Sequence, residues 1–494
     1  MRPLRQLATQ TAIYGFTTIL VRMLNYLLAP LHTRVFTDQA DYGIISEMYA
    51  YVTFINVIAM FGLETAFFRF ASNNTNELDK NKVFGSAQLS LIITTLLMVG
   101  LLIVSAGDIA TALNYAGRNN YIIFFALIIG FDTLTNIPFA KLRLENRPWK
   151  YFTYKFINIL VNILLNLFFL WPALKNDFTL FSAFGYTYQP EYGILYVFVA
   201  NLIASAVTFS LFIPDLFHIK FDLAIWKKLM RYGAPLIILG LAGMINETLD
   251  RVLIKYWGSG TLNDNMKQVG IYSAVYKISI FMTLAVQGFR MGAEPFFFKQ
   301  SLEKNAPVTY ANVMKYFVIA CCIIFLGVGM FPDIFKVIIG EEYHEGLHIV
   351  PILLLANLFL GIYYNQSVWY KLTDKTVFAT IIPIVGAVIT IALNFILIPI
   401  LGYTGAAWTT LACYFSMVVM SFIIGQKHYH VPYNLRKIIA YLLVSIVLCL
   451  FGLGLYNTLD NYILSFVIRL ILVILFFVFA WWLDISKLVR SKPN

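Results

Sequence analysis

Charged residues are scarce in this chain of 494 residues. Asp, Glu, Lys and Arg together make up 12% of it, whereas hydrophobic residues make up 60%. Soluble domains carry roughly 25% charged residues, and a soluble fold of this length could not bury so much apolar surface. Apolar runs of about 20 residues, long enough to cross a hydrocarbon layer of about 30 Å, recur from end to end. The sequence therefore predicts an all-α polytopic membrane protein.

Loop cysteines, large loops and catalytic motifs are also missing. The four cysteines, Cys321, Cys322, Cys413 and Cys449, all lie within apolar runs, where they are expected to be small core residues. The longest outer loop is only "PALKNDFTLFSAFGYTYQP". The sequence contains no phosphate-binding glycine loop, Cys-x-x-Cys pair or Ser-His-Asp constellation. These absences argue against an integral-membrane glycan polymerase or ligase, which would be expected to carry its catalytic residues in a sizeable outer loop.

Fourteen membrane spans are predicted from the apolar runs. They cover 10–34, 43–67, 83–106, 119–140, 151–172, 191–213, 232–256, 268–292, 311–331, 347–370, 376–399, 404–425, 436–456 and 461–483. With the N-terminus inside, most of the 36 lysines and arginines fall in inner loops, as the positive-inside rule requires. We therefore expect a multi-pass membrane protein with both termini cytoplasmic. The net charge of +11 is a topology signal, and no nucleic-acid partner is expected.

An internal repeat organises the spans. The second and eighth spans share G-x-x-S-x-x-Y, in "DYGIISEMY" and "QVGIYSAVYK". A repeat of six spans relates two lobes by a pseudo-two-fold axis along the membrane normal, with a cavity between them. The expected organisation is an N-terminal lobe at 1–220, a C-terminal lobe at 221–430, and two extra spans with a cytoplasmic tail at 431–494.

Intramembrane charges concentrate in a few spans. A charge near mid-membrane costs roughly 2.5–3.5 kcal/mol on insertion scales, so it normally faces a cavity or a partner. All but one lie in spans 1, 2, 4, 7 and 8, around the predicted axis; the set is Arg22, Glu47, Glu64, Asp132, Glu247, Asp250, Arg251, Lys277, Arg290, Glu294 and Arg469. We expect most of them to line a polar cavity, and Arg469 to extend toward the interface.

Two of the deepest charges are basic. Arg22 and Lys277 have no acidic residue at helical spacing in their own spans, so they are the first candidates for binding an anion. The alternative is that they pair with Glu47 or Asp132 of other spans.

Charges nearer the membrane surfaces suggest gates. Glu64 with Arg290, and Arg69 with Glu294, could bridge the lobes on the cytoplasmic side. The simpler alternative is an intrahelical pair between Arg290 and Glu294, four residues apart. In "GMINETLDRVLIKYWG", Glu247, Asp250 and Arg251 share one helix face; cavity lining and helix packing are equally good interpretations of the last two.

The segment "GEEYHEGLHIV" places two histidines four residues apart among glutamates. That spacing suits a metal ion on a helix, but a solvated acidic helix start is far commoner. No metal site is therefore expected.

Several segments together resemble one family. They are "PLHTRVFTDQADYGIISEMYAYVTFINVIAMFGLETAFFRFAS", "FAKLRLENRPWKYF", "LDRVLIKYWG", "VGIYSAVYKIS", "GFRMGAEPFFF", "IIGEEYHEGLHIVPILLL" and "LGYTGAAWTTL". In this order they are similar to the polysaccharide-transport (Wzx-type, O-antigen) branch of the multidrug/oligosaccharidyl-lipid/polysaccharide (MOP) exporters. The similarity covers the first twelve spans; the last two match only in number and position.

The resemblance implies a flippase rather than an enzyme. Its substrate would be an undecaprenyl-diphosphate-linked oligosaccharide, a repeat unit of lipopolysaccharide O-antigen, capsule or exopolysaccharide, moved from the cytoplasmic to the outer leaflet by alternating access. The last two spans would form a groove for the prenyl tail, and the diphosphate would meet Arg22 with Lys277 or Arg290, and Arg251 nearby. Aromatic and amide side chains such as Tyr26 and Asn246 could contact sugars, although a generic core role is the commoner one for any single residue of this kind.

The same resemblance implies no cofactor, but it does imply an energy source. We expect coupling to an H⁺ or Na⁺ gradient through Asp132, Glu247 or Asp250. The expected partners are the lipid bilayer, a glycan polymerase and a chain-length regulator. A cation-coupled multidrug exporter of the same superfamily is the main alternative, although such exporters usually have twelve spans and acid-dominated cavities. A scaffold role in a glycan-assembly complex is a further alternative.

Overall fold

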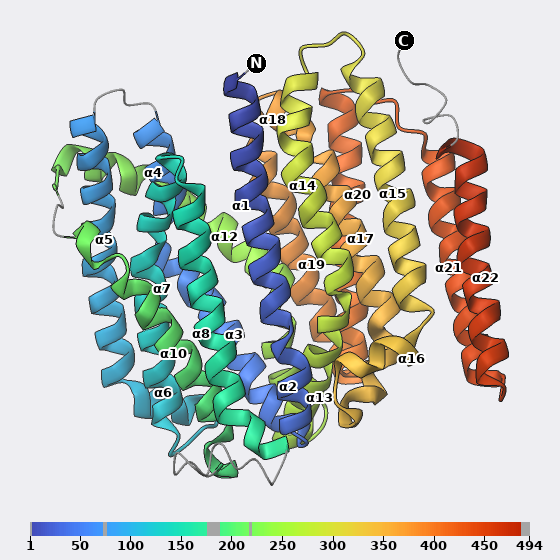
Figure 1. Cartoon of the computed structure of the whole chain (residues 1–494), viewed down its shortest axis with the longest axis horizontal. Helices are drawn as coiled ribbons and strands as arrows, with labels where there is room; N and C mark the ends of the chain where they lie inside the picture. The colour runs from blue at the N-terminus through green and yellow to red at the C-terminus, as the bar shows by residue number, and fades with distance from the viewer. Residues whose placement is uncertain (1, 73–76, 175–187, 217–219, 486–494) are drawn as a thin grey trace. The chain divides into compact units, whose positions relative to one another are not determined.

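The computed structural model describes residues 2–72, 77–174, 188–216 and 220–485, and within these ranges every regular element is helical. All fourteen predicted spans coincide with helices (Figure 1). The chain separates into two compact units, Met1–Val252 and Leu253–Asn494. The predicted lobe boundary at residue 220 thus lies inside the first unit, and the division into lobes stays a prediction.

The first unit contains the first seven spans. Its helices are α1 (Arg2–Tyr26), α2 (Leu28–Val35), α3 (Gln39–Met60), α4 (Leu63–Ser72), α5 (Glu77–Val104), α6 (Ala106–Ala112), α7 (Asn119–Leu144), α8 (Pro148–Leu174), α10 (Gly193–Ser210), α11 (Ile213–Leu216) and most of α12 (Leu223–Trp257), with a short 3₁₀ turn η1 (Pro190–Tyr192).

The second unit contains the other seven. Its elements are α13 (Leu262–Tyr276), η2 (Lys277–Ser279), α14 (Ile280–Gln300), α15 (Ala306–Gly329), α16 (Pro332–Phe335), η3 (Lys336–Ile338), η4 (Glu341–Ile349), α17 (Val350–Gln366), α18 (Val368–Leu372), α19 (Phe378–Leu401), α20 (Tyr403–His428), α21 (Leu435–Thr458), α22 (Tyr462–Ala480) and the π turn η5 (Trp481–Ile485).

Each unit repeats the same order of neighbouring helices. In the first unit, α7 packs against α3, α5 and α10, and α10 packs against α8. In the second, α17 packs against α14, α15 and α20, and α20 packs against α19. These elements correspond one to one under the repeat expected from the sequence. The repeat therefore exists at the level of helix packing.

Twelve stretches of helix in the described part of the chain are long and apolar enough to cross a membrane. The two predicted spans outside this set are α1 and α12, which are the first members of the two repeats. Both are long helices, of 25 and 35 residues, but they carry the charges discussed above. Polar and charged side chains along these helices lower their apolarity.

A sharp bend between α3 and α4 brings α12 close. Phe61 and Gly62 both adopt positive φ, of 50° and 64°, and this left-handed conformation interrupts the helix. A Cβ on Gly62 would lie 2.7 Å from the Gly233 carbonyl oxygen of α12, and one on Gly233 would lie 2.3 Å from the Phe61 carbonyl oxygen. Glycine is therefore needed on both sides of this crossing, because membrane helices approach closely through small residues.

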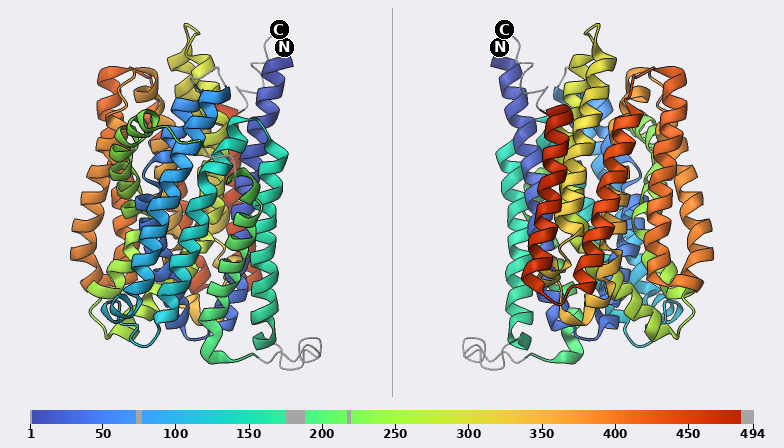
Figure 2. Two further views of the ribbon diagram at one scale, coloured as in Figure 1. Left: turned by 90° about the vertical axis from the view of Figure 1, so that its left-hand side faces the viewer. Right: turned by 90° about the vertical axis from the view of Figure 1, so that its right-hand side faces the viewer.

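The last two helices pack side by side against α15 (Figure 2, right). At one end, Asp484 of η5 accepts bonds from Lys315 Nζ of α15 and Lys437 Nζ of α21, each at 2.8 Å, and from the Tyr441 hydroxyl at 2.8 Å. This buried carboxylate therefore connects the end of α22 to α15 and α21.

At the other end of α22, a buried ion pair performs the same role. Arg469 donates from Nη1 to Asp333 Oδ1 of α16 at 2.7 Å and to the Met330 carbonyl oxygen at 2.6 Å. Its Nε bonds to the Ser465 carbonyl oxygen, and the Tyr462 hydroxyl donates to Asp333 at 3.0 Å. The Arg469 side chain is completely buried. The prediction that it extends outward is wrong, because an acidic partner distant in sequence satisfies its guanidinium inside the protein.

Candidate functional site

Charged groups from α1 and α12 converge in the first unit. Tyr26, near the end of α1, interacts electrostatically with Arg22 of its own helix and with Glu247 and Arg251 of α12. The α12 residues lie four positions apart and therefore on one face. The stripe seen in the sequence is thus part of a polar cluster, which we call the α1–α12 cluster. Its members are Arg22, Tyr26, Tyr42, Glu247, Asp250 and Arg251.

The two halves of this cluster differ in exposure. Asp250 is buried and accepts a bond from Arg251 Nη1 at 3.1 Å, while the same Nη1 bonds to the Glu247 carbonyl oxygen at 3.1 Å. Arg251 also interacts electrostatically with the buried Tyr42 of α3. This half is packed into the unit, as the helix-packing interpretation expects. Arg22 and Glu247 are exposed side chains, so the open half presents one charge of each sign.

The predicted cations of the second unit lie on the α13–α14 span. Lys277 is at the start of η2, where the span changes from α-helix to a 3₁₀ turn, and is half-buried. Arg290 is exposed, with its guanidinium carbon 4.7 Å from the centre of the Tyr364 ring of α17. The side chain of Glu294 lies outside the described residues. The bridges from Arg290 and Glu294 to Glu64 and Arg69 therefore stay predictions.

The two residues proposed for the inner gate have neighbours in the first unit. Glu64 of α4 is hydrogen-bonded and ion-paired to Arg143 at the end of α7. Arg69 places its guanidinium carbon 4.5 Å from the ring centre of Tyr232 on α12. Sequence reasoning counted Arg143 only as an inner-loop cation, because nothing at helical spacing connects it to a residue 79 positions away.

Asp132 of α7 also has a counter-charge that the sequence did not indicate. It interacts electrostatically with Lys155 of α8. Nζ of Lys155 lies 4.0 Å from the Phe139 ring centre, which is within cation–π distance. Asp132 and Lys155 thus interact electrostatically between α7 and α8, and Lys155 also interacts with Glu64 and Arg143.

Glu47, an intramembrane carboxylate of α3, is fully buried. The Tyr51 hydroxyl donates to its Oε1 at 2.6 Å, and the Tyr115 hydroxyl from the α6–α7 turn donates to its Oε2. Two hydroxyl donors to one carboxylate compensate for its desolvation. Glu47 thus connects α3 to the turn before α7 within the unit.

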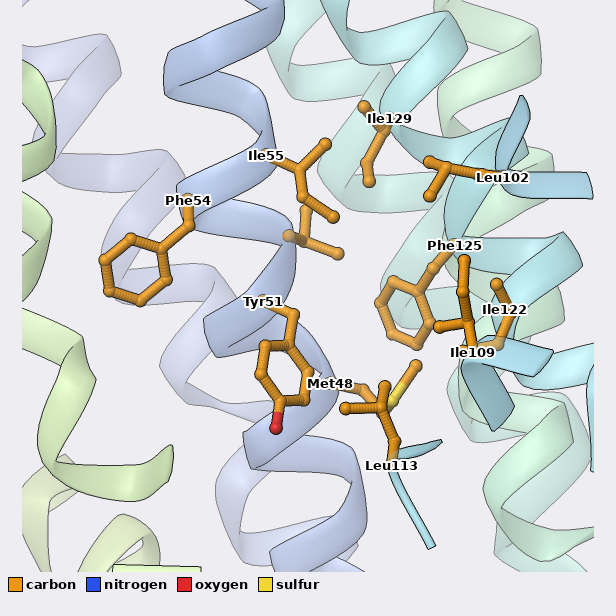
Figure 3. A pocket seen from close by; sticks show the side chains of 12 residues that line it. Met48, Tyr51, Phe54, Ile55, Leu102, Ile109, Leu113, Ile122, Phe125 and Ile129 are labelled. Carbon is orange, nitrogen blue, oxygen red and sulfur yellow. The ribbon is translucent and has the colours of Figure 1, made fainter. Parts of the chain in front are cut away.

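Beside Glu47 lies a cavity of about 330 Å³ between α3, α5, α6 and α7. Figure 3 shows Met48, Leu102, Phe125 and Ile129 lining it, with the Tyr51 hydroxyl directed away from its centre. Walls of this kind suit hydrocarbon and would desolvate a charged headgroup without compensation. The cavity is therefore apolar, whereas the α1–α12 cluster is polar and charged.

The histidine cluster of η4 makes hydrogen bonds of its own. His344 Nε2 lies 3.1 Å from the Lys336 carbonyl oxygen, and His348 Nε2 lies 3.0 Å from Thr404 Oγ1. Within the described ranges, no group of three or more His, Cys, Asp or Glu side chains is arranged to hold a metal ion.

Comparison with solved structures shows the fold. The chain is similar to the lipid II flippase MurJ in an inward closed conformation, with a TM-score of 0.68 and 16% identity, covering 97% of this chain and 100% of that one. It is also similar to an inward-facing multidrug resistance MATE transporter of the MOP superfamily (TM-score 0.60, 14% identity, 86% and 95% covered). A Vibrio cholerae MATE transporter, VcmN, matches with a TM-score of 0.55 and 14% identity over 88% of this chain and 98% of that one.

The chain thus shares its fold with these transporters, and the match to the flippase extends over almost the whole chain. Among curated proteins, none matches the sequence significantly. The model of one protein family, described as polysaccharide biosynthesis protein, matches residues 7–300, more than half of the chain. The chain therefore belongs to the polysaccharide biosynthesis protein family.

Proposed function

We propose that this protein moves a polyprenyl-diphosphate-linked oligosaccharide from the cytoplasmic to the outer leaflet of a bacterial inner membrane by alternating access. The observation that carries the proposal is the family match, on a fold that a lipid II flippase shares over 97% of the chain. The cargo would be a repeat unit of a surface glycan, and the role is transport without covalent chemistry.

The charges of the α1–α12 cluster support this cargo. A diphosphate brings about two negative charges, which need charge-assisted hydrogen bonds where the dielectric is low. Arg22 is exposed and Arg251 is held in place by its bond to Asp250. We assign Arg22, with Lys277, Arg251 and Arg290, to headgroup binding. Glu64, Arg69 and Glu294 are assigned to closing the inner side.

Energy for the cycle is proposed to come from an H⁺ or Na⁺ gradient. The carboxylates assigned to sensing it are Asp132, Glu247 and Asp250, of which Asp132 and Asp250 already face cations in this structure. Protonation or cation binding would release those cations for other partners. A glycan polymerase and a chain-length regulator are the proposed protein partners, because they act on the exported repeat unit.

The test is a flipping assay in liposomes. Purified protein is reconstituted with a short polyprenyl-diphosphate oligosaccharide, and an external enzyme reports its exposure on the outer leaflet. We expect protein-dependent exposure that falls at least tenfold in Arg22→Ala/Lys277→Ala. The matched control is Lys82→Ala, whose exposed ammonium lies 3.9–4.0 Å from Asp79 and Asp222.

The same assay separates the alternatives. Absence of exposure under every ion gradient, together with proton-linked efflux of a cationic dye, would assign the protein to multidrug export. Flipping that persists after all ion gradients are collapsed would remove the coupling proposal but leave the cargo assignment intact.

A further inference from the structure

Arg143, in the last turn of α7, is held on three sides at the junction of α4, α7 and α8. Its Nη2 bonds to the Glu64 carboxylate of α4. Its guanidinium carbon lies 4.9 Å from the ring centre of Phe68 and 5.9 Å from that of Tyr151. Aromatic faces hold a guanidinium in one orientation without using its hydrogen-bond donors. The guanidinium group, a planar fork of N–H donors, is therefore held in place, but not all of its donors have an acceptor.

The unfilled donor can be identified. Arg143 Nε is buried and has no hydrogen-bond partner within the described structure. A buried donor without an acceptor is unfavourable. Arg469 offers a contrast in the same chain, because its Nε, Nη1 and Nη2 all have oxygen partners. Arg469 is thus a structural arginine, whereas Arg143 has capacity for a further acceptor.

Partial exposure of both side chains allows another acceptor to replace Glu64 at Arg143. The Arg143 and Glu64 side chains are 33% and 34% exposed, so Glu64 can leave the pair and be hydrated at little cost. The hydroxyls of Tyr14 and Tyr151 and the ammonium of Lys155 interact electrostatically with Arg143. The Tyr14 hydroxyl already donates to the Leu142 carbonyl oxygen, so an anion replacing Glu64 would meet the amine of Lys155 and the hydroxyl of Tyr151.

The chemistry of the fork selects the anion. Arginine binds carboxylate and phosphate oxygens with the same two-donor geometry. A phosphate can therefore bind where Glu64 now does and also reach the Nε donor. We propose that Arg143 is a phosphate-binding residue for the diphosphate headgroup, and that Glu64 is its intramolecular competitor, which occupies the fork before loading and returns at release. The inference rests on the proposed function for its cargo.

The charges around the pair agree with this exchange. Lys141, two residues earlier, is engaged with Asp215 at 3.4 Å and with Glu145 at 3.9 Å. Arg147 Nε bonds to Glu145 at 3.0 Å. Arg147 is thus an exposed, paired arginine on the same corner of the unit, and it serves as a matched control for Arg143.

The experiment measures binding separately from flipping. Full-length protein in nanodiscs is titrated with inorganic pyrophosphate and with a short-chain prenyl diphosphate. For both probes we expect Glu64→Gln to tighten binding about three- to tenfold, because an intramolecular competitor is lost. Arg143→Gln should weaken it at least tenfold, Arg143→Lys should be intermediate, and Arg147→Gln should stay within twofold of wild type.

Each result has one meaning. Weaker binding in Glu64→Gln, or unchanged binding in a folded Arg143→Gln protein, overturns the inference, because a merely structural ion pair gives no gain of affinity when broken. Melting temperatures establish that each variant is folded. If binding follows the expected order but no variant or wild type flips the lipid-linked substrate, the anion site stands and the proposed function fails. If wild type flips and Arg143→Gln binds and flips equally well, only the inference fails.

Discussion

Breaking the Arg469–Asp333 pair is expected to be among the most damaging single changes outside the candidate site. The Arg469 side chain is fully buried and the Asp333 side chain is 3% exposed. Arg469→Met removes the donors at 2.7 and 3.3 Å from the carboxylate and leaves Asp333 with the Tyr462 hydroxyl. Removing one partner of a buried ion pair costs about 3–5 kcal/mol, since the other charge stays desolvated.

The free energy of unfolding would be measured by titrating detergent-solubilised protein with a denaturing detergent. The exposed control is Lys82→Met, whose pairs are solvent-screened and worth no more than about 1 kcal/mol. Arg469→Met combined with Asp333→Leu removes both charges. It should regain most of the lost stability, because an apolar pair of similar volume is often no worse than a buried ion pair.

Two results would refute this reasoning. A cost for Arg469→Met no larger than that of Lys82→Met would mean that the buried charge is neutralised in another way. A double variant less stable than either single variant would mean that the pair's hydrogen bonds, rather than desolvation of the remaining charge, dominate. The first outcome would also remove the interpretation of Arg469 as the anchor of α22.

Two further predictions concern helix packing. Gly62→Ala should lower the free energy of unfolding by about 1–3 kcal/mol, because the position has positive φ and contacts Gly233. The control is Gly100→Ala, which should be neutral or stabilising because nothing lies within 4 Å of its added Cβ. The same detergent titration measures both. Asp484→Asn should loosen α21 and α22 from α15, because the two lysine partners of Asp484 lose their buried counter-charge. Limited proteolysis of the C-terminal helices should then become at least several times faster. An unchanged rate would contradict the anchoring role of Asp484.

Sequence reasoning succeeded where the signal is local. The length and apolarity of each run predicted the fourteen helices, and the shared motif predicted a repeat that the helix neighbours confirm. The face shared by Glu247 and Arg251 predicted a polar stripe, and the structure brings Arg22 to the same place. Each of these follows from spacing along one helix.

The residues with which the charged side chains pair could not be predicted from the sequence. Glu64 and Arg143 are 79 residues apart, and Asp333 and Arg469 are 136 residues apart. Helical periodicity gives the face on which a side chain lies, but not the helix that faces it. Arg143 was therefore interpreted as an ordinary loop cation and Arg469 as a snorkelling one.

By itself the sequence determined that the protein is embedded in lipid, where its helices lie along the chain and that its plan is duplicated. It could do so because the cost of placing a polar backbone or charge in hydrocarbon is paid residue by residue. Only the tertiary structure decided which charges are neutralised and which stay exposed. That choice depends on distances of a few ångströms between helices far apart in the chain, where one bend at Phe61 and Gly62 sets how closely α12 can approach.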